Sequence, residues 1–390
     1  MRVLHLAYTF YEADTRVLRY AEALVADGHE VDVLSLRRRR DEPVEETLNG
    51  VRVTRLQPRQ INERRAAAYL FKMLAFSLRS AAVMASRHRE RPYDLIHVHN
   101  PPDFLVFSAW FAKRGGARVI LDIHDLVPEL YRDKFGKSPD HWEIRLLGAV
   151  ERLSASFADH VIAANDLWLE KLTVRSVPPD RCTVLLNYPD TRLFKPARRE
   201  KNPSDGFLIF YPGSLNRHQG LDVAVRAFAR ARPQMPGARF LICGEGPAKE
   251  ALQKLASELN LNSSVDIRPP VPLERVAELM QQADLGVIPK RAEGFGDEAF
   301  STKSLEFMAC GVPVVMSRTT VDTWYFGEDL VRFFPSGDID ALAAEFVAAY
   351  RDREAAGERA RRAQAFAREQ SWENHLHEYL ELVARLTRSA

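Results

Sequence analysis

Residues 298–315 read EAFSTKSLEFMACGVPVV, and this stretch carries the clearest indication of the fold. Ser301 or Thr302 can cap a helix that continues through an apolar face and stops at Gly311. An apolar, β-branched run follows at once over Val312–Met316 and predicts a buried strand. A helix that turns directly into a buried strand is typical of parallel sheets in α/β proteins.

The same alternation of strand and helix extends along the chain in both directions from this block. Upstream, the predicted strands are Val3–Ala7, Val31–Leu36, Asp94–Val98, Arg118–Ile123 and His160–Ala163, and the predicted helices are Asp14–Ala26, Arg64–Arg87, one from near Asp103, and Trp142–Phe157. Downstream, strands are expected at Phe207–Tyr211, Arg239–Cys243, Val265–Ile267 and Asp284–Ile288, with helices at Leu221–Arg232, Ala248–Leu259, Glu274–Gln282 and Lys303–Ala309. The pattern predicts parallel sheets covered by helices on both faces.

A change of composition divides the chain into two parts. Residues 187–206 are rich in Pro, Asp, Asn, Lys and Arg, as linkers are. We therefore predict an α/β protein with two doubly wound, Rossmann-like domains that face each other across a cleft. The predicted domains are 1–190 and 207–370, joined by a linker at 191–206, and a final helix at 371–390 is expected to pack back on the first domain.

Composition excludes several other classes of protein. The 390 residues are 46% hydrophobic and 28% charged, with a mean hydropathy of −0.27, which argues against disorder and against a membrane span. The first residues show no signal peptide, and three widely spaced cysteines suit buried thiols in a reducing compartment. A net charge of +2 argues against a nucleic-acid partner, so a cytoplasmic protein is expected.

Ligands of open α/β sheets bind beyond the carboxyl ends of the strands, which directs attention to the turns. In the block quoted above, a helix N-terminus and Lys303 together favour an anion. Glu298 and Glu306 flank that helix start, and carboxylates accept hydrogen bonds from sugar hydroxyls. The alternative is a capped core helix with two incidental glutamates.

The ordered set of motifs resembles the retaining glycosyltransferases of family 4, which have the GT-B fold. The resemblance rests on the Glu-x7-Glu block and on GSLNRHQGLD (213–222), CGEGP (243–247), ADLGVIP (283–289), PSGDIDALA (335–343) and SWENHL (371–376). In the first half it rests on DLIHVHNPPD (94–103), LDIHDLVPEL (121–130) and ERLSASFADHVIAAN (151–165). It covers nearly the whole chain.

The resemblance implies a role for each matching residue. Glu306 would hold the ribose of a nucleotide, Glu298 would face the donor sugar, and His124 would contact that sugar near its reacting carbon. The backbone of Phe300, Ser301 and Thr302 would hold the diphosphate, and Val271 would lie beside the base. The other donor positions lie in turns after strands, at Gly213, Ser214, Gln219 and Gly244.

Two departures from the family pattern affect these expectations. Relatives often have Arg and Lys where this chain has Ser214 and Gln219, so we expect Arg217, with Lys290 or Lys303, to supply the positive charge. The first strand-to-helix turn lacks the glycines of many relatives, and Asp14 and Arg16 there are candidates for touching the acceptor. The alternative for Asp14 is a helix cap.

Further acceptor candidates lie at the strand ends of the first half. We expect His99, with Asn100, to reach the site and His97 to pack on the opposite face of the strand. Asp125 is a candidate for the acceptor site or for a helix cap. No spacing of His, Asp or Glu predicts a metal site, so no metal and no cofactor are expected.

Residues 52–91 contain ten basic and two acidic residues. Together with apolar residues at helical spacing, this indicates either a basic amphipathic helix on an anionic membrane, at its inner face, or a core helix with a solvated basic edge.

The sequence thus predicts a retaining, metal-independent transferase that moves a sugar from a nucleotide diphosphate to a hydroxyl. UDP is favoured and GDP is the alternative, with a glycan or lipid-linked acceptor in polysaccharide, lipopolysaccharide or glycolipid assembly. The alternatives are a non-catalytic binding homologue and a nucleotide-sugar epimerase of the same fold.

Overall fold

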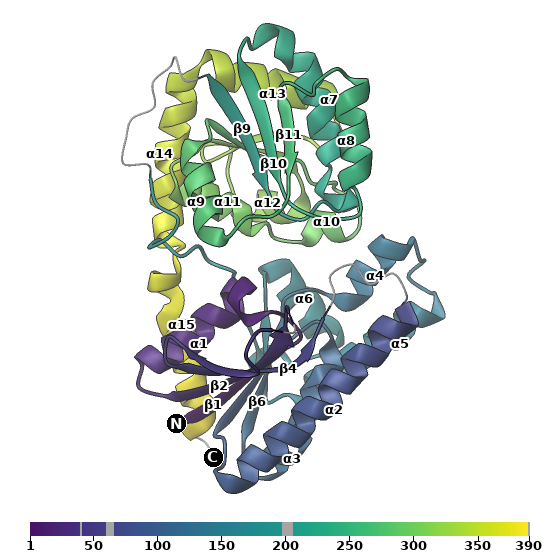
Figure 1. Cartoon of the computed structure of the whole chain (residues 1–390), viewed down its shortest axis with the longest axis vertical. Helices are drawn as coiled ribbons and strands as arrows, with labels where there is room; N and C mark the ends of the chain where they lie inside the picture. Colours follow the sequence, from purple (N-terminus) through teal and green to yellow (C-terminus); the bar gives the residue numbers. More distant parts are fainter. Residues whose placement is uncertain (40, 60–65, 197–205, 389–390) are drawn as a thin grey trace. The chain divides into compact units, whose positions relative to one another are not determined.

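The computed structural model describes residues 1–39, 41–59, 66–196 and 206–388. The chain forms two compact α/β units, drawn with their helices and strands in Figure 1. Unit 1 contains residues 1–187 and 376–390, and unit 2 contains residues 188–375. Most of the predicted linker, residues 197–205, lies outside the described residues.

Unit 1 is built on an eight-stranded sheet in the order β3-β4-β2-β1-β5-β6-β7-β8. All its neighbouring strands run parallel except the antiparallel pair β3–β4. The strands are β1 (Arg2–Ala7), β2 (Glu30–Arg37), β3 (Glu45–Leu48), β4 (Val51–Pro58), β5 (Leu95–His99), β6 (Arg118–Ile123), β7 (His160–Ala163) and β8 (Cys182–Val184). The helices are η1 (Tyr11–Ala13), α1 (Thr15–Ala26), α2 (Ala66–Glu90), η2 (Asp103–Ala109), α3 (Trp110–Arg114), α4 (Val127–Phe135), α5 (Trp142–Phe157), α6 (Asp166–Arg175) and η3 (Pro179–Arg181).

Unit 2 has a six-stranded, wholly parallel sheet in the order β11-β10-β9-β12-β13-β14. The strands are β9 (Phe207–Pro212), β10 (Ala238–Cys243), β11 (Val265–Arg268), β12 (Leu285–Ile288), β13 (Val314–Arg318) and β14 (Arg332–Pro335). The helices are η5 (Arg217–Gln219), α7 (Leu221–Ala231), η6 (Arg232–Gln234), α8 (Lys249–Glu258), α9 (Leu273–Gln282), α10 (Phe295–Glu298), α11 (Thr302–Ala309), α12 (Thr320–Tyr325), α13 (Ile339–Arg351) and α14 (Arg353–Glu369). Helix α15 (Trp372–Arg388) begins in unit 2 and belongs to unit 1 from Leu376 onward.

The sheet of unit 2 separates two apolar cores because successive side chains of a strand point to opposite faces. In β9, Ile209 and Tyr211 join the core beneath α7, α8 and α13, whereas Phe210 joins the core beneath α9, α11 and α14. This arrangement explains the continuous apolar runs from which the strands were predicted. The three cysteines are buried and free, as expected from their spacing.

The hairpin β3–β4 was not predicted, although the sequence carries its signal. Asn49 and Gly50 form its two-residue loop between the paired residues Leu48 and Val51, and both have positive φ. Asn-Gly is the pair that such a turn prefers. The charged residues of β3, which lie at the edge of the sheet, hide the alternation on which a strand prediction depends.

Each sheet reverses its strand order at one place, and that place positions a ligand site. In unit 1 the reversal lies between β1 and β5, and in unit 2 it lies between β9 and β12. The loops that leave these strands diverge to opposite faces of the sheet and leave a crevice at its carboxyl edge. Sites are therefore expected next to the segments after β1 and β5, and next to those after β9 and β12.

Candidate functional site

In unit 2, glycines hold the loops of the carboxyl edge in direct contact. A Cβ on Gly220 would lie 1.9 Å from the carbonyl oxygen of Pro289, so the loop after β9 packs on the loop after β12. A Cβ on Gly244 would lie 1.8 Å from the carbonyl oxygen of Gly213. No side chain fits at either position, and the crevice is lined by closely packed backbone.

The N-terminus of α11 lies at this crevice. Ser301 is its N-cap residue, but its side chain makes no capping hydrogen bond, which contradicts the predicted side-chain cap. The Ser301 hydroxyl is buried and has no hydrogen-bond partner among the described residues. An uncapped helix start beside an unused buried hydroxyl is suited to an anionic oxygen.

Lys303, in the first turn of α11, brings a positive charge to the same place. Its Nζ lies 3.3 Å from where a Cβ of Gly213 would stand and 5.3 Å from the centroid of the Tyr211 ring. Burial lowers the pKa of Lys303 to about 8, although Glu306 acts in the opposite direction. A bound anion would favour the protonated amine and raise this pKa again.

The two residues that depart from the family pattern are held within their own loop. The Tyr211 hydroxyl lies 3.0 Å from the carbonyl oxygen of Ser214 and 2.9 Å from Oε1 of Gln219. Nε2 of Gln219 is 2.9 Å from Nε2 of His218. The amide of Gln219 therefore stabilises the loop where many relatives carry a cation.

The other candidate cations have different surroundings. Lys290 is buried, donates to the carbonyl oxygen of Ala299 at 2.7 Å and pairs with Asp322 at 2.8 Å. Its charge is therefore matched inside the protein, where it fixes the segment that precedes α11. Arg217 is exposed and lines a hollow of about 410 Å³ beside α7 and α8, together with Asp222.

The remaining donor-site candidates of unit 2 surround the start of α11. Glu298 ends α10, Glu306 lies one turn inside α11, and both are half-buried and engaged in interactions. Phe300 packs its ring against Tyr325 at 4.9 Å, and Val271 rests against the same core.

In unit 1, a buried ion pair lies at the carboxyl edge of the sheet. Arg16 of α1 donates from Nε and Nη2 to the two carboxylate oxygens of Asp122, at 2.8 Å each, and from Nη1 to the carbonyl of Leu185. Burial would raise the pKa of Asp122, but Arg16 and His124 lower it well below its usual range. Arg16, a predicted acceptor contact, therefore points into the protein because this carboxylate needs a cation.

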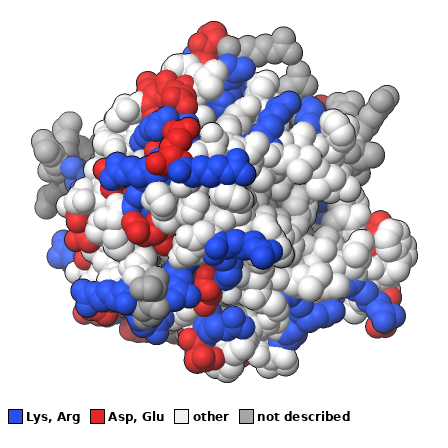
Figure 2. Space-filling model, turned by 90° about the horizontal axis from the view of Figure 1, so that it is seen from below, with Lys and Arg blue, Asp and Glu red and all other residues white. Residues whose placement is uncertain are grey.

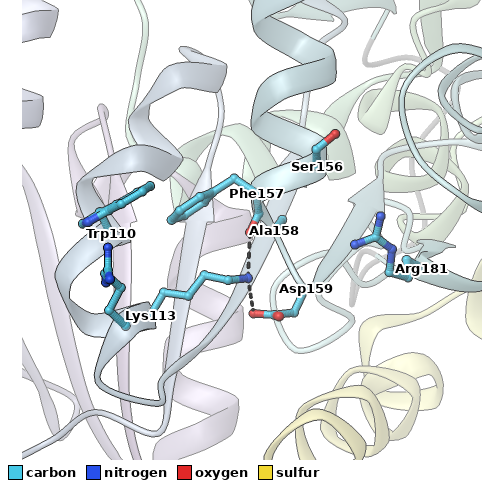
Figure 3. A pocket seen from close by; sticks show the side chains of 8 residues that line it. Trp110, Lys113, Ser156, Phe157, Ala158, Asp159 and Arg181 are labelled. Atoms are coloured by element: carbon cyan, nitrogen blue, oxygen red, sulfur yellow. Dashed lines mark hydrogen bonds and ion pairs between the residues drawn. The ribbon is translucent and has the colours of Figure 1, made fainter.

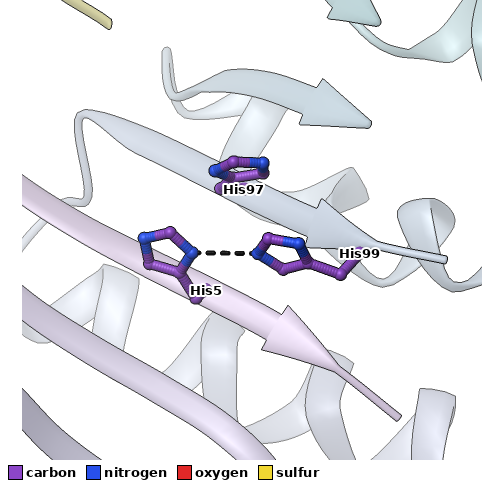
Figure 4. Close-up of side chains that lie close together, drawn as sticks. All are labelled: His5, His97 and His99. Atoms are coloured by element: carbon purple, nitrogen blue, oxygen red, sulfur yellow. Dashed lines mark hydrogen bonds between the residues drawn. The ribbon is translucent and has the colours of Figure 1, made fainter. Parts of the chain in front are cut away.

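Four histidines surround Asp122. His99 Nδ1 and His124 Nε2 lie 3.2 Å and 3.1 Å from its Oδ2, and His5 Nδ1 lies 3.0 Å from His99 Nε2. His97 stacks on His99 with ring centroids 4.2 Å apart, and Figure 4 shows it beside the His5–His99 hydrogen bond. Burial lowers the pKa values of His5, His97 and His99, which favours their neutral forms.

The expectation that His97 and His99 point to opposite faces was wrong. Residues two apart in a strand share a face, so both rings lie on the same side of β5. His97 is buried and lies 2.9 Å from the hydroxyl of Tyr379 in α15.

Asn100 and Asp14 act within the backbone framework. Asn100 Oδ1 accepts from the backbone N–H of His124 at 2.6 Å, and its Nδ2 donates to Asp103 and to the carbonyl of Asp125. The amide thus ties the segment after β5 to the segment after β6 and sets the position of His124. Asp14 caps α1 by accepting from the N–H of Val17, which is the alternative considered for it.

A further hollow of unit 1 lies away from these predicted residues. It has a volume of about 460 Å³ and is lined by Trp110, Lys113, Phe157, Asp159 and Arg181, among others (Figure 3). Asp159 and Arg181 directly precede β7 and β8, so the hollow lies at the amino edge of the sheet. Nζ of Lys113 is already bound there by Asp159 and by the carbonyl of Phe157.

Comparison with known proteins agrees with this architecture. A family model described as a glycosyl transferase 4-like domain matches residues 13–187, and one described as glycosyl transferases group 1 matches residues 194–370. The D-inositol 3-phosphate glycosyltransferase of Thermomonospora curvata is 30% identical over 326 residues, which cover 77% of this chain and 73% of that protein. The protein of the same name from Acidothermus cellulolyticus is 29% identical over 332 residues, covering 77% and 69%.

Solved structures share the fold at lower identity. Sucrose-phosphate synthase from Thermosynechococcus elongatus has a TM-score of 0.82 at 20% identity, with both chains covered completely (100%). HepE of Anabaena in complex with UDP-glucose has a TM-score of 0.71 at 16% identity, also with 100% of both chains covered. The two parallel α/β units are those of a GT-B glycosyltransferase.

The family matches extend over both units and are supported by curated relatives along three quarters of the chain. The chain belongs to the glycosyltransferases of family 4 and is a glycosyltransferase enzyme.

The position of Lys303 predicts how anion binding depends on pH. Before a nucleotide binds, the amine of Lys303 has a pKa of about 8. The affinity for a nucleoside diphosphate should therefore fall as the pH rises through this value, because Lys303 loses its proton. Lys303→Ala should weaken binding roughly 10- to 100-fold at neutral pH, as expected for a charged hydrogen-bond partner. Isothermal titration with UDP would measure both effects.

Lys303→Arg is the matched control, since arginine stays charged throughout this range. The decline between about pH 7 and pH 9 should be smaller in this variant. An equal decline in wild type and in Lys303→Arg would assign the pH dependence to another group.

Proposed function

We propose that this enzyme is a retaining glycosyltransferase that uses a nucleotide diphosphate sugar, with UDP favoured and GDP as the alternative. The observation that carries the proposal is the anion-binding geometry at the switch point of unit 2. There the uncapped start of α11, the unused Ser301 hydroxyl and Lys303 meet beside Gly213. The solved complex of HepE with UDP-glucose supports the choice of UDP.

The proposed acceptor is a hydroxyl of a glycan or of a lipid-linked sugar in polysaccharide, lipopolysaccharide or glycolipid assembly. This hydroxyl attacks the anomeric carbon while the nucleoside diphosphate leaves from the same face. An oxygen of the leaving phosphate takes the proton of the acceptor, so the reaction needs no protein nucleophile. Glu298 orients the donor sugar, and Glu306 accepts hydrogen bonds from the ribose hydroxyls.

Negative charge develops on the leaving diphosphate as the sugar–phosphate bond breaks, and the protein has positively charged and N–H groups that can stabilise it. Lys303 and the N–H groups of the first turn of α11 are fixed before the substrate arrives, so they stabilise the departing charge without reorganisation. We therefore propose that a divalent cation is not required for nucleotide binding.

The test is a melting-temperature panel with UDP, GDP, ADP and dTDP, each with and without EDTA. A nucleotide at about 100 times its Kd stabilises the native state by about 2.7 kcal/mol. One diphosphate should raise Tm, and EDTA should leave that rise unchanged. A rise that EDTA abolishes would contradict metal-independent binding, and no rise with any nucleotide would contradict the donor class.

Glu298→Gln separates catalysis from nucleotide binding. The variant keeps the size of the side chain but loses its charge, so transfer should fall by roughly 100-fold or more while UDP still raises Tm. The measurement is release of UDP from the donor sugar in the presence and absence of acceptors.

Two outcomes of this assay would favour other functions. Nucleotide binding without any turnover would favour a non-catalytic homologue. Gln219 is the reason to consider this alternative, because it is bound by Tyr211 where many relatives carry a cation. Conversion of the sugar without an acceptor would identify an epimerase.

We also propose that unit 1 contacts a membrane surface, but through apolar rather than basic groups. Several of the basic residues that the structure describes in region 52–91 pair with carboxylates of unit 1. Arg55 pairs with Glu12 and Glu46, and Arg91 pairs with Glu30. Figure 2, which views the molecule from below, shows both basic and acidic side chains on this face, with uncharged surface between them.

Helix α2 instead exposes large apolar side chains. Phe71 and Leu78 are 72% and 73% exposed, while Phe76 and Met84 are buried in unit 1. Its segment Ala68–Glu90 is long and apolar enough to cross a membrane by length and composition, and 17% of its most apolar window is buried. Exposed apolar residues also lie on α3, which packs against α2, and on α5: Trp110, Phe111, Trp142, Leu146 and Leu153. A helix with one face packed in the domain and the other exposed and apolar is suited to lie along a membrane.

Flotation with vesicles tests this contact. Wild type should float with neutral as well as anionic vesicles and should do so at high salt, because apolar burial is not screened. Phe71→Asp with Leu78→Asp should abolish flotation. Val174→Asp is the matched control, since this residue is 89% exposed on α6. Binding only to anionic vesicles at low salt would contradict the apolar contact.

A further inference from the structure

The histidines and Asp122 of unit 1 form a hydrogen-bonded chain that the reaction proposed above does not use. Asp122 is the buried carboxylate at one end of this series of hydrogen bonds, and both of its oxygens accept from Arg16. Its Oδ2 lies 3.2 Å from His99 Nδ1 and 3.1 Å from His124 Nε2, and these two nitrogens lie 3.1 Å from each other. His5 and His99 meet end to end, with Nδ1 and Nε2 3.0 Å apart and the ring planes 15° apart.

One distribution of protons satisfies these contacts with neutral rings. His99 and His124 each donate to the Asp122 carboxylate, because a lone pair on either nitrogen would face the lone pairs of Oδ2. His99 Nε2 then accepts from His5 Nδ1–H. This leaves Nε2 of His5 as a bare acceptor, and that atom has no partner among the described residues. The reverse direction would need a proton on His99 Nε2, and a neutral ring that already carries its proton on Nδ1 has none there.

This distribution determines which ring nitrogen of His124 can meet a substrate. Nε2 carries the proton and is bound to Asp122, so Nδ1 holds the lone pair. Nδ1 makes no hydrogen bond with any described residue, and the His124 side chain is 18% exposed. The backbone N–H of His124, held by Asn100, fixes the base of the ring.

We propose that Asp122, with its charge held by Arg16, is a positioning residue that keeps His124 in the Nε2–H form, so that Nδ1 accepts a hydrogen bond from a substrate hydroxyl. The role of His124 toward a substrate rests on the transferase function proposed above. The tautomer itself does not depend on that function.

A metal ion is the competing explanation for this cluster. His99 Nδ1, His124 Nε2 and Asp122 Oδ2 are 3.1–3.2 Å from one another, a spacing that three ligands of one cation can also adopt. Arg16 argues against it, because Nε lies 2.8 Å from the same Oδ2 and already neutralises the carboxylate. A dication would add an unmatched charge to a buried site.

Nitrogen-15 NMR of the histidine rings in the wild-type protein tests the tautomer directly. The cross-peaks of His124, identified among the eleven histidines by their loss in His124→Gln, should show the proton on Nε2 and a bare Nδ1. A proton on Nδ1, protons on both nitrogens, or one equivalent of metal by elemental analysis would each overturn the proposal.

Asp122→Asn tests the consequence. The carboxamide oxygen can still face Arg16, so its NH₂ group turns toward the histidines and donates where the carboxylate accepted. His124 should change to the Nδ1–H form, and kcat should fall at least about 100-fold, as when a triad carboxylate is amidated, while UDP binding in unit 2 is unchanged. A normal kcat with an altered tautomer would overturn the role toward substrate.

Asp32→Asn is the matched control for lost stability. Asp32 is another buried carboxylate of unit 1, paired with Arg2 at 2.9 Å on β2. This variant should lower Tm but leave the His124 tautomer and kcat unchanged. If the wild-type protein transfers no sugar, the proposed transferase function is wrong. The NMR spectrum still tests the tautomer of His124 in that case.

Discussion

The parallel arrangement of both sheets is the constraint on which the rest of the structure depends. It brings the carboxyl ends of all strands except the antiparallel β3 to one edge of each sheet, and the reversal of strand order opens a crevice there. Residues far apart in sequence, such as Gly213 and Lys303, become neighbours for this reason alone. The topology of each sheet thus determines where its site lies, and the side chains determine the chemistry of that site.

Each unit places a fully buried ion pair at this edge. In unit 1, Arg16 and Asp122 join α1 to β6, and in unit 2, Lys290 and Asp322 join the segment after β12 to α12. Removing one partner of such a pair costs about 3–5 kcal/mol, since the other charge stays buried without a partner. Arg16 and Lys290, which the sequence suggested as substrate contacts, therefore stabilise the fold from inside. The contacts proposed for a ligand are instead the backbone N–H groups at the start of α11, the Ser301 hydroxyl, Lys303, Glu298, Glu306 and the outer nitrogen of His124.

The sequence predicted most of the fold because apolar runs and turns are local signals. Strands β6 and β7 and helix α5 have the predicted boundaries, and Asp14 caps α1 as its residue type suggested. Ser301 stands at the N-cap of α11, but its side chain makes no capping hydrogen bond. The hairpin β3–β4 was missed because its outer strand is charged, although Asn49-Gly50 marks its turn. Helices α6, α10 and α12 were also missed, and each of them has no more than ten residues.

The candidate site was harder to predict, because a residue type does not reveal its partners. Arg16, Lys290 and Asn100 were predicted as site residues because they are polar and lie after strands. In the structure their side chains bind Asp122, the carbonyl of Ala299 and the carbonyl of Asp125, and no local sequence pattern reveals these partners. Asp122 was not predicted as a site residue, since a single aspartate inside an apolar strand matches no motif. Its burial among four histidines was the signal, and only the structure contains it.

A crystal structure of the protein with UDP is the most direct test of the central claim, that unit 2 binds a nucleoside diphosphate at the start of α11. Phosphate density is expected within hydrogen-bond distance of Lys303 Nζ and of the Ser301 hydroxyl, next to Gly213. Phosphate density in the hollow beside Arg217 and Asp222, with the start of α11 empty, would contradict it.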